Sequence, residues 1–142
     1  MTRRAPLLVA LLAVAAAALA ACGKEGITLN AKRGDTAQIK HGAQLFAARC
    51  AGCHTLGAAG THGSATKVND RERTDGPNLD QRKEDLNSVL FAIRNGGFSG
   101  AIMPQNIVVG PDAQAVATFV SRYAGTQAKN PKSPPPAPAT GG

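Results

Sequence analysis

The pentapeptide Cys50-Ala51-Gly52-Cys53-His54 restricts this chain more than any other stretch of its sequence. Its two sulfurs lie three residues apart on one turn, so both can bond the same ligand. The imidazole of His54 follows at the next position and can point at the centre of that ligand. A stripe of small and apolar residues with helical spacing leads into Cys50, which places the motif at the end of a helix.

A cysteine pair followed by histidine is the spacing of a c-type haem attachment site. In this interpretation Cys50 and Cys53 form thioethers with two vinyl-derived carbons of one porphyrin, and His54 binds the iron. A thioredoxin-type pair would need a preceding strand in a βαβ unit. Zinc would commonly need a second cysteine pair or a paired histidine, which His41 and His62 do not supply. A disulfide across the motif would be strained. We therefore predict one covalent haem c.

The composition also favours a bound group. Aromatic residues make up 4% of the chain and tryptophan is absent, so side chains alone would build a thin core. Small domains of this kind usually need a disulfide, a metal or a cofactor. The formal net charge of +7 indicates either a solvated surface or a basic rim that steers an acidic redox partner. No cluster of lysine and arginine contains interleaved aromatics, so we expect no nucleic-acid partner.

The first 21 residues have the pattern of an export signal, with Thr2-Arg3-Arg4 followed by an apolar run from Ala5 to Ala21. The run ends in Leu19-Ala20-Ala21-Cys22, which resembles the bacterial lipoprotein box. That resemblance implies cleavage before Cys22 and a diacylglycerol on its sulfur, and two fatty chains suffice for stable anchoring. A plain soluble export signal and an uncleaved anchor helix are the alternatives. We expect an extracytoplasmic domain anchored to the outer face of a bacterial cell membrane.

The chain after the signal divides into three parts. Residues 22–36 are mainly polar, contain three glycines and are predicted to be a flexible tether. Residues 37–125 form the folded domain. Residues 126–142 are rich in proline, serine, threonine and glycine and are predicted to be a disordered tail. Within the folded domain, residues 55–75 have no helical period and are expected to form a long loop.

Three helices are predicted in the folded domain from apolar residues at helical spacing, in residues 39–50, 86–93 and 116–123. Asn95-Gly96-Gly97 should end the second helix, and Gly110-Pro111-Asp112 should begin the third. No stretch shows sustained alternation of apolar and polar residues. We therefore predict an all-α fold with three main helices plus loops wrapped around one covalent haem.

Met103 is the only methionine that remains after the signal is removed, and it lies in Gly100-Ala101-Ile102-Met103-Pro104. A lone methionine often fills a gap in a core. A methionine before proline in a loop is instead well placed to present its thioether, and Met/His ligation raises the potential of a c-type haem. We predict Met103 as the second axial ligand. His62, in the loop that follows His54, is the weaker alternative.

These features together resemble the small monohaem class I cytochromes c over most of the folded domain. Besides the cysteine and histidine motif, the resemblance rests on Gly42 and Phe46 before it and on Met103-Pro104. In that family the glycine and the aromatic let the C-terminal helix cross closely. The aromatic residue of that last helix corresponds to Phe119 or Tyr123.

Gly76-Pro77-Asn78-Leu79 is similar to the family's loop in which a proline carbonyl accepts the imidazole N–H, which implies that Pro77 supports His54. The stretch between these two residues is longer than in compact members. The resemblance implies an electron carrier rather than an enzyme, with redox partners such as a membrane reductase and a terminal oxidase or reductase. The alternatives are a haem subunit of a larger respiratory oxidoreductase complex, and a haem enzyme or gas sensor with a labile sixth ligand.

Overall fold

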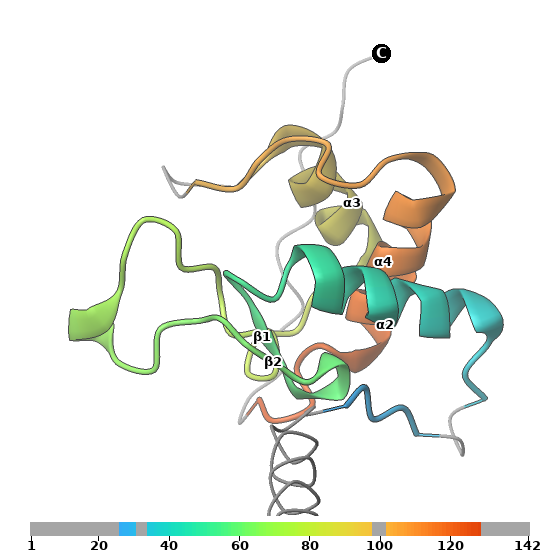
Figure 1. Cartoon of the computed structure of the whole chain (residues 1–142), viewed down its shortest axis with the longest axis horizontal. Helices are drawn as coiled ribbons and strands as arrows, with labels where there is room; N and C mark the ends of the chain where they lie inside the picture. The colour runs from blue at the N-terminus through green and yellow to red at the C-terminus, as the bar shows by residue number, and fades with distance from the viewer. Residues whose placement is uncertain (1–25, 31–33, 98–101, 129–142) are drawn as a thin grey trace, which may run out of the picture.

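Three helices form the framework of the folded domain (Figure 1). The structure, a computed structural model, describes residues 26–30, 34–97 and 102–128. The helix α2 crosses α4 in the principal helix contact, and α3 packs against α4. The predicted helical class is confirmed. The bounds of the helices are Ala37–Arg49 for α2, Leu86–Asn95 for α3 and Gly110–Tyr123 for α4.

Local side chains and a glycine set the ends of these helices. Oγ1 of Thr36 accepts a backbone N–H of the first turn of α2 at 3.4 Å. The carboxylate of Asp85 accepts the N–H of Ser88 at 2.9 Å and caps α3. That hydrogen bond holds the pKa of Asp85 below its usual value. Gly96 follows the last residue of α3 with a φ of 79°, as the glycine signal in the sequence predicts.

The crossing of α2 and α4 depends on the absence of a side chain at Gly42. A Cβ at this position would overlap the carbonyl oxygen of Ala115 and would lie 2.9 Å from Cβ of Phe119. Beside this contact the ring of Phe46 meets Phe119 edge-on with centroids 5.9 Å apart, and Phe119 lies 5.3 Å from Tyr123. All three rings are buried. Three of the five aromatic side chains of the chain therefore lie together beside this crossing.

The stretch after His54 forms a short ribbon. Strand β1 (Thr55–Leu56) pairs antiparallel with β2 (Thr61–His62), and the 3₁₀ helix η2 (Gly57–Ala59) connects them. A second 3₁₀ helix, η3 (Val68–Asp70), follows. Strands of two residues show no alternating pattern, which is why the sequence predicts only a loop here. The ribbon is too small to change the helical class.

Part of the segment before α2 lies against the domain, and residues 26–30 and 34–36 are termed the N-terminal strap. The N–H of Thr28 donates to the carbonyl of Ala58 at 3.0 Å, and Leu29 packs against the hydrophobic core. The prediction of a flexible tether over residues 22–36 does not anticipate these contacts. The predicted signal peptide and most of the predicted tail lie outside the described residues.

Replacing Gly42 by alanine should lower the free energy of unfolding by about 1–3 kcal/mol, because the added methyl group overpacks the helix crossing. A urea titration followed by far-ultraviolet circular dichroism measures this change. The matched control is Gln44→Ala on the exposed face of the same helix, which should change stability by less than about 0.5 kcal/mol. Equal stabilities for the Gly42 variant and the wild type would contradict the close crossing.

Candidate functional site

A cavity of about 410 Å³ lies between the C-terminal end of α2, the helices α3 and α4, and the loop that follows α3. Its volume falls in the range of small-molecule and cofactor sites. Its wall is mainly apolar and includes Phe46, Val89, Ile93, Val116 and Val120.

Five of the six site residues predicted from the sequence line this cavity: Cys50, Cys53, His54, Pro77 and Met103. The sixth, Cys22, lies outside the described residues. The chain therefore brings together, around one apolar space, the two thiols, the imidazole and the thioether that the sequence separates by up to 53 positions.

The two cysteines lie on the turn that ends α2. The N–H of Cys50 still donates to Phe46 of the helix at 2.8 Å, and the carbonyl of Cys50 accepts the N–H groups of Cys53 at 3.2 Å and His54 at 3.0 Å. The two sulfurs are not joined in a disulfide. Burial and, secondly, the neighbouring Cys53 raise the pKa of Cys50 to about 11. A reactive redox cysteine needs a lowered pKa, so this environment argues against a thioredoxin-type pair.

His54 is oriented by the chain segment that contains Pro77. Its Nδ1 lies 3.2 Å from the carbonyl oxygen of Pro77, to which it donates when Nδ1 carries the proton. Burial lowers the pKa of His54, the bond to Pro77 opposes this effect, and nearby Arg82 adds to it. The imidazole is therefore kept neutral, with Nε2 available as a lone-pair donor, which is the form that binds a metal.

Gly76 lets this segment approach the histidine. Its N–H donates to the carbonyl of Cys53 at 2.8 Å. A Cβ at position 76 would overlap the ring of His54, so the backbone here lies directly against the imidazole. Position 76 therefore has to be glycine for His54 to keep this orientation.

The ribbon after His54 and the residues that follow Pro77 also support the cysteine and histidine motif. The N–H of Gly63 donates to the carbonyl of His54 at 3.3 Å, and the N–H of Leu79 donates to Thr55 at 2.9 Å. Both carboxylate oxygens of buried Asp80 accept the N–H of Gly57, at 2.9 and 3.0 Å. The ribbon is thus a brace for the cysteine and histidine motif, which the sequence does not reveal.

Met103 comes from the loop between α3 and α4. It is half-buried and packs against the hydrophobic core. The loop is held by the N–H of Ile102, which donates to Arg73 at 2.9 Å, and by the N–H of Asn106, which donates to Ile93 at 2.7 Å. Its neighbours 98–101 lie outside the described residues. The assignment of Met103 as an axial ligand stays a prediction.

Charged residues of the cavity wall were not predicted from the sequence. Nε of Arg82 lies 2.5 Å from Oε1 of Glu84, whose side chain is 10% exposed. Burial raises the pKa of Glu84, and Arg82 opposes that rise. Arg49 and Arg71 also line the cavity. Arg71, Arg82 and Glu84 stand in mainly polar stretches, so no pattern in the sequence distinguishes them from solvated charges.

The donor set fits a haem. Two thiols on one turn, a neutral imidazole at the next residue and a largely apolar wall match the needs of a porphyrin attached through two thioethers and one nitrogen ligand. The glycine backbone at position 76 leaves the imidazole room to stand against Pro77. Fold and site together define a small helical domain built to hold one c-type haem.

The sequence model of the Cytochrome c family matches residues 39–124, which is more than half of the chain. The protein therefore belongs to the cytochrome c family, whose members carry covalently attached haem c, and Cys50 and Cys53 have the spacing of that attachment motif. A search of curated proteins finds no match to this chain.

Replacing Gly76 by alanine should lower the fraction of protein that carries covalent haem, because the new Cβ displaces His54 from Pro77. Mutations of residues that orient a metal ligand typically lower metal affinity or activity by about 10- to 100-fold. Intact-mass spectrometry and the visible absorption of the purified protein measure the loaded fraction. Gly52→Ala is the control, since a Cβ there meets nothing within 4 Å. Full loading of the Gly76 variant would contradict the proposed role of this contact.

Proposed function

We propose that this protein is an electron carrier that uses one haem c with His54 and Met103 as axial ligands, and that it is tethered to the outer face of the membrane through a lipidated Cys22. Its membership of the cytochrome c family supports a haem-based electron-transfer function. The proposed ligation by His54 and Met103 is supported by one observation, that Met103 lines the same apolar cavity as His54 and the two cysteines.

Bound haem supplies a one-electron centre, because its iron alternates between the ferrous and ferric states. The residues of this chain favour transfer over substrate chemistry. His54 and Met103 together would supply the iron with two protein ligands, which would leave no position for a substrate or for oxygen. The mainly apolar wall would limit the access of water to the iron, so the same two ligands could persist in both oxidation states.

The charges around the cavity support redox proteins as partners. Arg49, Arg71 and Arg82 line the cavity together with Asp75 and Glu84, and Arg82 pairs with Glu84, so basic residues outnumber acidic ones there by one. Without Arg3 and Arg4 of the signal, the chain has 14 lysines and arginines against 9 acidic residues, a net charge of +5. A net positive charge attracts an acidic partner and raises the rate of encounter. We propose a membrane reductase as the donor and a terminal oxidase or reductase as the acceptor.

The anchor is proposed from the sequence around Cys22, where a basic start, an apolar run and Leu19-Ala20-Ala21-Cys22 follow in the order of a lipoprotein signal. Within the described residues no helix is long and apolar enough to cross a membrane. Two acyl chains on the cysteine would supply both signals that stable membrane attachment requires.

Replacing Met103 by alanine should remove the charge-transfer band expected of ferric iron bound by a thioether and should lower the midpoint potential. The fall should be on the order of 0.1 V, well inside the range of about 0.8 V that axial ligands set. Spectroelectrochemistry of the purified holoprotein measures both changes. His62→Ala is the matched control, and it should leave the band and the potential unchanged.

The same spectra test the alternative of a haem enzyme or gas sensor with a labile sixth ligand. A wild-type protein that lacks the thioether band and binds carbon monoxide avidly would contradict the carrier function. A stable, stoichiometric partner after mild solubilisation would instead support a dedicated subunit of a larger oxidoreductase complex.

Replacing Cys22 by serine should abolish lipidation and release the haem protein from the membrane fraction, because the acyl chains are lost. Intact-mass spectrometry of the wild type should find Cys22 as a modified N-terminal residue. An unmodified N-terminus at another position in the wild type would refute the anchor and leave the haem assignment unaffected.

A further inference from the structure

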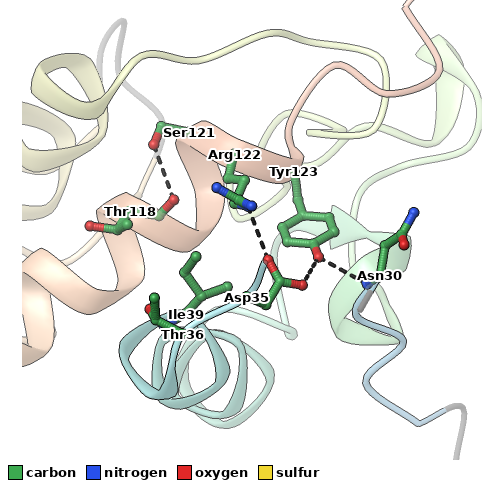
Figure 2. A network of polar contacts seen from close by, with 8 residues as sticks. All are labelled: Asn30, Asp35, Thr36, Ile39, Thr118, Ser121, Arg122 and Tyr123. Atoms are coloured by element: carbon green, nitrogen blue, oxygen red, sulfur yellow. Dashed lines mark hydrogen bonds and ion pairs between the residues drawn. The ribbon is translucent and has the colours of Figure 1, made fainter. Parts of the chain in front are cut away.

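The C-terminal end of α4 is joined to the N-terminal strap by a group of polar contacts (Figure 2). The hydroxyl of Tyr123 donates to Oδ2 of Asp35 and accepts the N–H of Asn30 at 3.0 Å. Oδ1 of Asp35 lies 3.0 Å from Nε of Arg122. One tyrosine hydroxyl therefore links two parts of the strap, before and after residues 31–33, to the last turn of α4.

The acidic side chain of this ion pair is buried, and the arginine is partly exposed. The side chain of Asp35 is 3% exposed and that of Arg122 is 34% exposed. A strap that left α4 would lose both hydrogen bonds of the Tyr123 hydroxyl and would separate Asp35 from Arg122. The loss of these contacts favours the attached strap over one that moves freely.

A second set of contacts holds the strap on the neighbouring surface. The N–H of Thr28 donates to the carbonyl of Ala58 in η2 at 3.0 Å. Leu29 packs against the hydrophobic core between this bond and Asn30. The strap is therefore fixed both to the brace behind the cysteine and histidine motif and to α4.

We propose that these contacts form a clamp that positions the domain on the membrane, with the face made by the strap, η2 and the end of α4 turned toward the lipid. This inference rests on the proposed lipidation of Cys22. At no more than about 3.6 Å per extended residue, the six steps from Cys22 to Thr28 reach at most about 22 Å, whereas fifteen steps to Ala37 would reach about 54 Å. The clamp thus shortens the tether by more than half and removes most of its rotational freedom.

The clamped strap leaves the haem cavity accessible. None of the described strap residues lines the cavity, whose wall comes from α2, α3, α4, residues 50–54, residues 71–84, residue 97 and residues 102–107. A partner can approach Arg49, Arg71 and Arg82 without displacing the strap. The clamp would therefore present the electron-exchange site at a constant height and angle to a partner in the same membrane.

The clamp is tested by hydrogen exchange on the full-length holoprotein in detergent, which needs neither lipidation nor a redox partner. In the wild type the amides of Thr28 and Asn30 should be protected. Tyr123→Phe keeps the buried ring and removes only the hydroxyl, so the Asn30 amide should exchange about tenfold faster while the haem spectrum is unchanged. Asp35→Asn should also speed exchange of the Asn30 amide, because Asp35 accepts the hydrogen bond that positions the Tyr123 hydroxyl.

Ser121→Ala is the matched control. Its hydroxyl donates only within α4, to the carbonyl of Thr118 at 3.1 Å, as Figure 2 shows. The Ser121 variant should exchange like the wild type. Unprotected Thr28 and Asn30 amides in the wild type, or equal exchange in Tyr123→Phe and Ser121→Ala, would overturn the clamp.

The orientation is tested by linear dichroism of the haem absorption in supported bilayers that hold the lipidated protein. The wild type and Ser121→Ala should show a clear dichroism, and Tyr123→Phe and Asp35→Asn should lose most of it. A lipidated, clamped wild type without dichroism would overturn the orientation. A wild type without lipid on Cys22 would overturn the anchor and the orientation together, while the exchange result would still decide the clamp.

Discussion

The close crossing of α2 and α4 at Gly42 is the contact on which the rest of the structure depends. It brings the carbonyl of Ala115 into the space that a side chain would fill, and Phe46 packs edge-on against Phe119 beside it. Because Cys50 follows directly at the end of α2, the crossing also determines where the haem attachment turn lies relative to Val116 and Val120 of α4, which line the same cavity. A wider crossing would move the thiols away from that wall.

The histidine that follows the cysteines depends on a different kind of support. Backbone groups hold His54: the carbonyl of Pro77 at Nδ1, the nearby Gly76 against the ring, and the ribbon residue Gly63 at its own carbonyl. Backbone atoms have few alternative positions once a loop is braced, so they orient an imidazole more rigidly than a flexible side chain would. The brace itself is secured by Asp80, which binds the N–H of Gly57 with both oxygens.

Much of this arrangement could be predicted from residue patterns, and the exceptions share a cause. Apolar spacing predicts all three helices, because a helix repeats its buried face at short intervals. The ribbon after His54 has strands of two residues, too short to show any period. The partnership of Arg82 with Glu84, and of Arg122 with Asp35, is equally hidden, since a charged residue looks the same in a sequence whether it meets solvent or a buried partner.

The sequence by itself determined the chemistry of this protein: the two thiols, the imidazole and the turn that presents them, all within five consecutive residues. Such a motif is readable because its geometry is local. The tertiary structure decided what surrounds that chemistry, namely that Met103 lines the same cavity and that the strap binds the end of α4 through Asp35 and Tyr123. These relations join residues about 50 to 90 positions apart, and only the packing of the helices brings them into contact.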